Sequence, residues 1–103
     1  MGNKNAKYDN IKELKNAKYD EVTDPYLSLK RYAAYADTRK EALDNLRMVC
    51  KENGIPQPKN MNDVYICGTL NIPYIFKYKK RLNPVWFSHR NGRYVAFVYY
   101  YDL

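Results

Sequence analysis

The chain has few of the side chains that serve most often as catalysts or metal ligands. Its 103 residues include one histidine, His89, and two cysteines, Cys50 and Cys67. A tetrahedral zinc site needs four ligands at clustered spacings, and these three residues cannot supply one without carboxylates. His89 has no nucleophile or carboxylate beside it in the sequence, so we expect a surface hydrogen-bonding residue. We therefore predict a protein that is not an enzyme and has no cofactor and no metal.

Long apolar runs and an apolar leader are also missing. The first ten residues are polar and basic, which is not the pattern of a secretory signal. Nothing approaches the run of about 18 apolar residues that a membrane helix needs. Ala6 stands where an N-myristoylation pattern needs Ser or Thr. We therefore expect a cytoplasmic protein with reduced thiols and no membrane attachment.

The length, charge and hydrophobic content of the chain fit one small basic domain. The chain has 18 Lys and Arg against 11 Asp and Glu, a net charge of +7, and 46% of its residues are hydrophobic. A chain of this length can bury a single core. We predict a basic amphipathic arm or helix over residues 1–22 and a single α+β globular domain over residues 23–103.

A six-residue repeat marks the N-terminal segment. The sequence Lys-Asn-Ala-Lys-Tyr-Asp occurs at residues 4–9 and again at residues 15–20. The offset of 11 residues is close to three helical turns, which would place Tyr8 and Tyr19 on one helix face. The pattern predicts a short basic amphipathic helix over residues 10–21. A local duplication in a partly frayed arm is the alternative.

A second helix is predicted over residues 25–36. Asp24 is a suitable N-cap, and Pro25 suits the first helical position. A strand over residues 28–36 is the competitor, because apolar and polar residues also partly alternate there. Three alanines in the segment favour the helix.

The clearest element is a helix over residues 39–53. Thr38 and Glu41 have the spacing of a capping box, and Gly54 stands where a left-handed C-cap belongs. The predicted apolar face consists of Ala42, Leu43, Leu46, Val49 and Cys50. On that face, Cys50 is expected to be a small core residue and not a nucleophile.

The C-terminal part predicts a sheet. Residues 64–69, 72–79, 85–90 and 93–101 are rich in β-branched and aromatic residues. Asn91-Gly92 predicts a tight hairpin that would pair Trp86 with Phe97, and Asn83-Pro84 predicts the preceding turn. The expected fold class is α+β, with two or three N-terminal helices packed on a C-terminal three- or four-stranded antiparallel sheet.

A winged helix-turn-helix is the less favoured alternative. Residues 63–81 can be read as two helices and a turn, with residues 74–81 as the reading helix and the hairpin at Asn91-Gly92 as the wing. The residues fit this pattern poorly, because residues 64–69 make a poor helix and Lys77 would have to pack inward. We therefore prefer the sheet.

The positive charge is concentrated in the last forty residues. Residues 1–63 hold 12 basic and 10 acidic side chains, whereas residues 64–103 hold 6 basic ones and a single acid, Asp102. The same stretch contains 11 of the 16 aromatic residues. Cations neutralise phosphates, and flat rings offer stacking platforms for bases. The combination predicts a surface that binds nucleic acid.

Nine side chains are the predicted nucleic-acid contacts. The cations are Lys77, Lys79, Lys80, Arg81, Arg90 and Arg93, and the aromatic residues are Tyr78, Trp86 and Tyr94. The first four cations form the densest cluster, and the other two flank the predicted hairpin tip. The solvated end of an ordinary strand can carry a similar cluster of cations. We prefer nucleic-acid binding because residues 64–101 contain no Asp or Glu.

We therefore expect a small non-catalytic nucleic-acid-binding accessory protein of phage or mobile-element type, with DNA and RNA both open. The alternative is a protein-binding inhibitor or adaptor, for example a phage protein that blocks a host defence enzyme. Both faces of residues 94–101 are apolar or aromatic, so one face would need a partner. An unprotected terminal strand also predicts a homo-oligomer, most simply a dimer.

Overall fold

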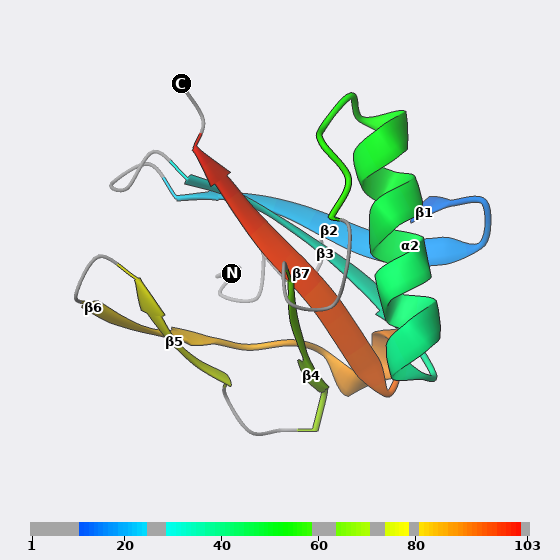
Figure 1. The fold of residues 1–103 in the computed structure, drawn as a ribbon. Helices are drawn as coiled ribbons and strands as arrows, with labels where there is room; N and C mark the ends of the chain where they lie inside the picture. Colours follow the sequence, from blue (N-terminus) through cyan, green and yellow to red (C-terminus); the bar gives the residue numbers. More distant parts are fainter. Residues whose placement is uncertain (1–10, 25–28, 59–63, 71–73, 79–80, 102–103) are drawn as a thin grey trace, which may run out of the picture.

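The computed structural model of the protein describes residues 11–24, 29–58, 64–70, 74–78 and 81–101. Among these residues are seven strands, one α-helix and one turn of 3₁₀-helix (Figure 1). Strands β1 (Lys12–Leu14), β2 (Ala17–Asp24), β3 (Leu29–Ala36), β7 (Tyr94–Tyr101) and β4 (Tyr65–Gly68) form one antiparallel sheet in that spatial order. Strands β5 (Tyr74–Tyr78) and β6 (Arg81–Val85) form a separate antiparallel pair.

The single described helix is the element that the sequence predicts best. Helix α2 spans Arg39–Glu52, and the Thr38 side chain accepts a hydrogen bond from the Glu41 backbone N–H at 3.1 Å. Gly54 has a φ of 72°, the left-handed conformation predicted after the helix end. All five residues of the predicted apolar face are buried, which confirms that Cys50 is a core residue.

The helix predicted over residues 10–21 is wrong, because this segment forms β1 and β2. Lys15 and Asn16 have φ values of 52° and 71° and connect the two strands. Two positive φ angles are what a two-residue hairpin turn requires. Along β2, Tyr19 is buried on one face of the sheet and Asp20 on the other. This two-residue period arises from pairing with β3, which the local repeat does not reveal.

The helix predicted over residues 25–36 is also wrong, because β3 occupies most of that segment. The competing strand reading agrees with the structure. Ala33 and Ala34 are fully buried on opposite faces of the sheet. β3 lies between β2 and β7, and alanine leaves room for tight packing on both of its faces. Tertiary burial therefore overrides the helix propensity of alanine.

The predicted hairpin at Asn91-Gly92 does not form. His89–Asn91 form the 3₁₀-helix η2, and β7 pairs with β3 and β4 instead of the preceding segment. Phe97 therefore lies opposite Ala33 and Tyr65, not opposite Trp86. The prediction fails because β7 finds partners far away in the sequence, and eight-residue pairing with β3 outweighs a local turn.

Two further C-terminal predictions are overturned. Asn83 and Pro84 lie within β6, so they do not form the predicted turn. The reading helix of a winged helix-turn-helix would cover residues 74–81, where β5 and the start of β6 lie. The architecture is still α+β-like, but it has one described helix on a five-stranded sheet. Two or three helices on a three- or four-stranded sheet are not what the structure shows.

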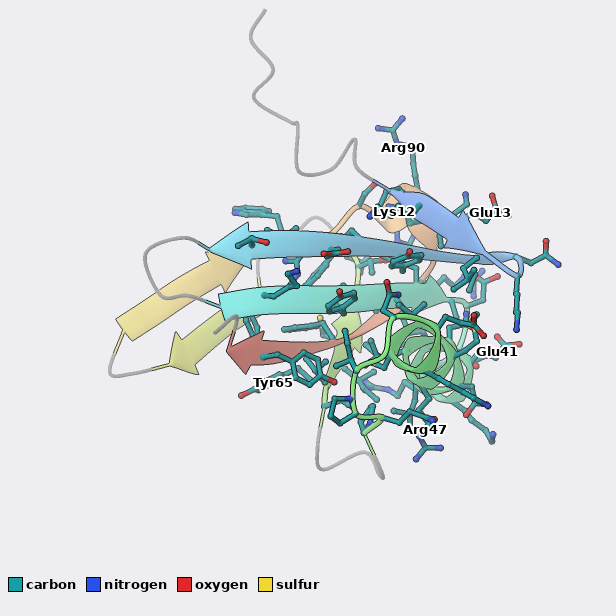
Figure 2. The ribbon with its side chains drawn as sticks, turned by 90° about the horizontal axis from the view of Figure 1, so that it is seen from above. Lys12, Glu13, Glu41, Arg47, Tyr65 and Arg90 are labelled. Atoms are coloured by element: carbon teal, nitrogen blue, oxygen red, sulfur yellow. The ribbon has the colours of Figure 1, made fainter. Side chains whose placement is uncertain are left out.

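The core has two layers, one on each face of the main sheet. Helix α2 covers one face, where Leu46 and Val49 pack with Tyr32 and Ala96 (Figures 1 and 2). On the other face, Phe87 packs against Tyr35, Val95 and Phe97, with Ile11 and Tyr99 at the margin. The ring centroids of Phe87 and Phe97 are 4.9 Å apart. The chain itself therefore covers both faces of the middle of β7.

Candidate nucleic-acid interface

Four connections meet at one end of the main sheet, which we call the loop end. It is the end at which β2 and β7 begin and β3 and β4 end. Ala36 and Gly68, the last residues of β3 and β4, both lie opposite Tyr94, the first residue of β7. Segments that are far apart in the sequence therefore present side chains to one region of the surface.

Thr69 fixes the backbone of the loop end. This residue is 1% exposed, and its backbone N–H donates to the Arg93 carbonyl at 3.0 Å. Its hydroxyl donates to the Gly92 carbonyl and lies 3.0 Å from Nδ1 of His89. His89 is exposed and hydrogen-bonded, as predicted. These bonds join the end of β4 to η2, which carries Arg90, and to the η2–β7 connection, which carries Arg93.

Gly92 is the second fixed point of the loop end. A Cβ atom at this position would lie 2.8 Å from the carbonyl oxygen and 2.9 Å from the nitrogen of Ala36. Such contacts are too short for any side chain. The absence of a side chain therefore allows the η2–β7 connection to lie directly on the end of β3.

Exposed cations gather at the loop end. Among the side chains that the structure describes, five cations form no ion pair with a described carboxylate: Lys18, Arg39, Lys51, Arg90 and Arg93. Four of them belong to the loop end, and Lys51 lies in the last turn of α2. Arg90 projects from η2 into solvent (Figure 2).

The remaining described cations are paired with acids. Glu21 pairs with Lys12 and Lys30, Asp44 pairs with Lys40 and Arg47, Glu52 pairs with Lys15, and Asp20 pairs with Arg31. Local neutralisation therefore covers much of the described surface outside the loop end. Most of the described cations that form no ion pair with a described carboxylate lie at the loop end, where two exposed acids, Asp37 and Glu41, also lie.

The nine predicted contact residues are spread over the described and undescribed parts of the chain. Arg90 and Arg93 are exposed at the loop end, and Tyr94 lies half-buried beneath Arg39. Trp86 is 47% exposed, in the segment between β6 and η2. The structure describes the backbone but not the side chains of Lys77, Tyr78 and Arg81, and Lys79 and Lys80 lie outside the described residues.

Two cations of the loop end were missed by the sequence analysis. Lys18 belongs to the N-terminal repeat, which suggested a helix face, and Arg39 looked like an ordinary residue of the first helical turn. The Arg39 guanidinium lies 5.2 Å from the centroid of the Tyr94 ring. No local signal connects Lys18 with Arg39, because the two residues reach the same end of the sheet only through the pairing of β2 with β3.

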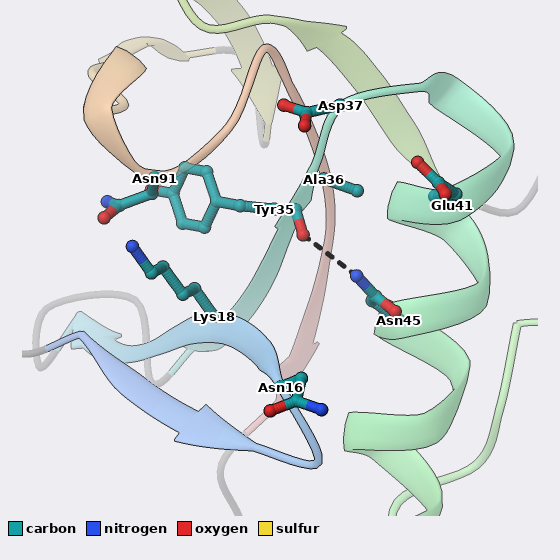
Figure 3. A pocket seen from close by; sticks show the side chains of 8 residues that line it. All are labelled: Asn16, Lys18, Tyr35, Ala36, Asp37, Glu41, Asn45 and Asn91. Carbon is teal, nitrogen blue, oxygen red and sulfur yellow. Dashed lines mark hydrogen bonds between the residues drawn. The ribbon is translucent and has the colours of Figure 1, made fainter.

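A polar pocket of about 290 Å³ opens at the loop end (Figure 3). Three amide side chains line it, from Asn16, Asn45 and Asn91. Three charged residues also line it, Lys18, Asp37 and Glu41, and the wall is completed by Tyr35 and Ala36. The lining thus comes from the β1–β2 turn, β2, β3, α2 and η2, so only the folded chain can assemble it.

Hydrogen bonds hold part of the lining in place. The Asn45 amide N–H donates to the Tyr35 carbonyl at 3.0 Å (Figure 3), and the Thr38 hydroxyl donates to the Glu41 carboxylate at 3.2 Å. Asp37 and Lys18 are exposed, and neither forms an ion pair with a described residue. The pocket therefore has one amide held by a hydrogen bond, that of Asn45, and two opposite charges that are available to a ligand.

A buried ion pair supports Tyr35, one of the residues that line the pocket. Nη2 of Arg31 donates to Asp20 at 2.8 Å, and the Tyr35 hydroxyl donates to the same carboxylate at 3.2 Å. The Arg31 guanidinium also lies 5.0 Å from the centroid of the Phe87 ring. Burial raises the pKa of Asp20 despite the opposing effect of Arg31. Burial likewise raises the pKa of Tyr35, so its hydroxyl stays protonated and donates.

The described residues offer no evident nucleophile or metal cluster. Burial raises the pKa of Cys67 to about 11, with Arg39 opposing the shift, and it also raises the pKa of Cys50. In the described parts of the chain, no three residues among His, Cys, Asp and Glu gather as metal ligands. Within the same parts, no helix has both the length and the apolar character needed to cross a membrane.

Comparison of the chain with models of protein families, with curated proteins and with solved structures finds no match. The geometry and charge of the loop end are therefore the basis for the function proposed below.

Proposed function

We propose that the protein binds nucleic acid without catalysing a reaction, and that the loop end is its phosphate-binding surface. The observation that carries the proposal is the gathering there of four exposed cations, Lys18, Arg39, Arg90 and Arg93, none of which pairs with a described carboxylate. A guanidinium group binds a phosphate through two parallel hydrogen bonds, so three arginines at one site suit a phosphate backbone.

The rigidity of the loop end supports this role. Arg90 lies in η2 and Arg93 in the connection after it, a segment that Thr69 holds by hydrogen bonds and that Gly92 places against Ala36. A backbone held in one position reduces the conformational entropy that binding must remove. The cations are thus presented from a fixed frame, although their own side chains reach into solvent.

Aromatic side chains contribute in two different ways. Trp86 is 47% exposed and has a free ring surface that suits stacking on an unpaired base. Tyr94 instead carries Arg39 over its ring, and this contact holds the guanidinium at the loop end. The revised site is therefore smaller than the basic aromatic sheet that the sequence suggested.

A salt series with labelled oligonucleotides tests the proposal. Fluorescence anisotropy would be recorded for a 20-nucleotide single strand and for its duplex between about 20 and 200 mM salt. Four phosphate contacts predict that log Kd rises with log salt at a slope of roughly 3. Absence of binding at low salt, or binding that is indifferent to salt, would contradict the proposal.

The protein-binding alternative and the homo-oligomer stay predictions. Val95, Ala96, Phe97 and Val98 of β7 are all buried, so the aromatic strand does not offer its middle as an interface. β7 is also not an edge strand, because β3 and β4 flank it. Among the described strands, a self-association through strand edges would use β1 or β4 of the main sheet, or an edge of the β5–β6 pair. Sedimentation across a concentration series measures it directly.

A further inference from the structure

We propose that the polar pocket holds one unpaired nucleobase that carries an exocyclic amino group, with guanine as the best match. Arg90 and Arg93 would then hold the adjacent phosphates. This inference rests on the proposed function and deepens it, because it specifies the form of nucleic acid that binds and the part of a nucleotide that is read.

The first argument is the pair of opposite charges in the pocket. Lys18 and Asp37 approach the pocket from different sides (Figure 3), and each is exposed. A ligand that satisfies both must offer an acceptor to the ammonium group and a donor to the carboxylate. A bare phosphate does not meet this requirement, because Asp37 and Glu41 would repel it. The edge of a nucleobase carries donors and acceptors side by side.

The second argument is the set of amides around these charges. Asn45 uses an N–H on the Tyr35 carbonyl, so its side-chain oxygen remains an acceptor. Asn91 from η2 and Asn16 from the β1–β2 turn add two further amides to the lining. Amide side chains read base edges through paired donor and acceptor contacts. The lining therefore matches a planar, neutral and polar group.

Guanine satisfies the charged groups best. Its O6 and N7 are acceptors that suit the Lys18 ammonium group, and its N1–H and amino group are donors that suit the Asp37 carboxylate. Thymine and uracil lack the amino group and offer one imide N–H. They would leave the carboxylate less well satisfied, and an unsatisfied polar group weakens binding.

The pocket size and the position of the arginines indicate a single unpaired nucleotide. A volume of about 290 Å³ is at the lower end for ligand pockets, which suits one base and not a longer segment. The pairing edge of a base in a duplex is occupied, so only an unpaired base can present it here. Arg90 directly precedes Asn91, so adjacent side chains can meet the phosphate and the base of one nucleotide.

The test uses a series of eight-nucleotide thymine strands in which one central position is changed to guanine, cytosine, adenine or an abasic site. Anisotropy titrations at fixed salt should give about tenfold tighter binding for the guanine strand than for the all-thymine strand. Asp37→Asn and Lys18→Met should each reduce this preference to less than about threefold. Arg90→Ala should weaken binding of all strands equally, and Lys51→Ala is the control for loss of one charge.

A second measurement does not depend on phosphate contacts. Guanosine, which has no phosphate, should shift the side-chain amide NMR signals of Asn16 and Asn45, whereas uridine should not. Salt-dependent binding of all strands with equal affinity for guanine, thymine and the abasic site overturns the pocket inference and leaves the proposed function intact. Failure of every strand to bind at low salt overturns the proposed function. Unshifted amides with guanosine overturn the pocket inference in either case.

Discussion

The Arg39 guanidinium lies over the ring of Tyr94, 5.2 Å from its centroid. This contact joins the first residue of helix α2 to the first residue of β7, across 55 positions of the chain. It places one cation of the loop end by tertiary packing, since neither residue is near the other in sequence. The contact shows that the basic surface of the loop end is formed by residues that no local sequence pattern links.

Removal of Arg90 in η2 and Arg93 in the η2–β7 connection should weaken binding of oligonucleotides and flatten its salt dependence. Arg90→Ala with Arg93→Ala should lower the slope of log Kd against log salt by about 2, because two phosphate contacts are lost. Both side chains are exposed, so the melting temperature should stay near that of the wild type. Lys30→Ala with Lys51→Ala removes the same charge elsewhere and is the control. Equal slopes for the two double variants would exclude the loop end as the phosphate site.

The contact between Arg39 and Tyr94 should be measurable as a coupling energy. In a double-mutant cycle with Arg39→Ala and Tyr94→Leu, we expect a coupling of about 0.5–1 kcal/mol in the free energy of unfolding by urea. Tyr94→Leu should also weaken oligonucleotide binding, because Arg39 loses its support. Additive effects on stability would show that the ring does not hold the guanidinium.

Thr69→Val should destabilise the fold although the two side chains have nearly the same shape. The change leaves the Gly92 carbonyl and Nδ1 of His89 without their hydroxyl partner at a buried site. We expect a loss of about 1–3 kcal/mol in the free energy of unfolding, measured with urea. Thr23→Val is the matched control, because Thr23 is exposed on β2. A similar loss in both variants would point to a general effect of the hydroxyl.

The buried ion pair of Asp20 and Arg31 should respond unequally to single and double replacement. Asp20→Asn leaves a guanidinium that is almost buried without its counter-charge, and we expect a loss of about 3–5 kcal/mol. Replacement of both residues, Asp20→Leu with Arg31→Met, should recover most of that loss, because no buried charge remains. Urea unfolding of the three proteins measures the difference. A double variant less stable than the single one would contradict this account.

Alkylation of Cys67 should be slow in the folded protein and should accelerate at high pH. Burial raises the pKa of its thiol from 9.0 to about 11, so the thiolate fraction at pH 8 is about 100-fold lower than that of an unshifted thiol. A proton held more tightly in the folded state also means that this group lowers stability as the pH rises from 9 to 11. Iodoacetamide labelling with peptide mass mapping would give the rate at each cysteine. Rates at pH 8 that equal those in urea would contradict the partial burial of Cys67.

The parts of the fold that follow from local chemistry can be read from the sequence. The limits of α2 depend on Thr38 before it and Gly54 after it, and its buried face repeats at helical spacing, so one segment contains all the information. β4, β5 and β7 are likewise marked by β-branched and aromatic residues. The concentration of positive charge in the last forty residues is also a property of the sequence alone.

The remaining features depend on contacts between distant segments. The local patterns of the β2 and β3 segments predict helices. Their burial comes instead from pairing of β2 with β3 and of β3 with β7, and a local sequence pattern contains no information about such pairing. The hairpin predicted at Asn91-Gly92 does not form, because β7 pairs with β3 and not with the segment that precedes it. The pairing of β3 with β2 and with β7 brings Lys18 and Arg39 to the end of the sheet that carries Arg90 and Arg93.

The sequence by itself determined one helix, the basic and aromatic character of the C-terminal part and the scarcity of catalytic side chains. Only the tertiary structure decided which cations meet and where the polar pocket opens. The physical reason is that a helix is closed by hydrogen bonds within four residues, whereas a sheet joins segments at any separation. The loop end is a product of the sheet, so its composition could be known only after the strands were placed.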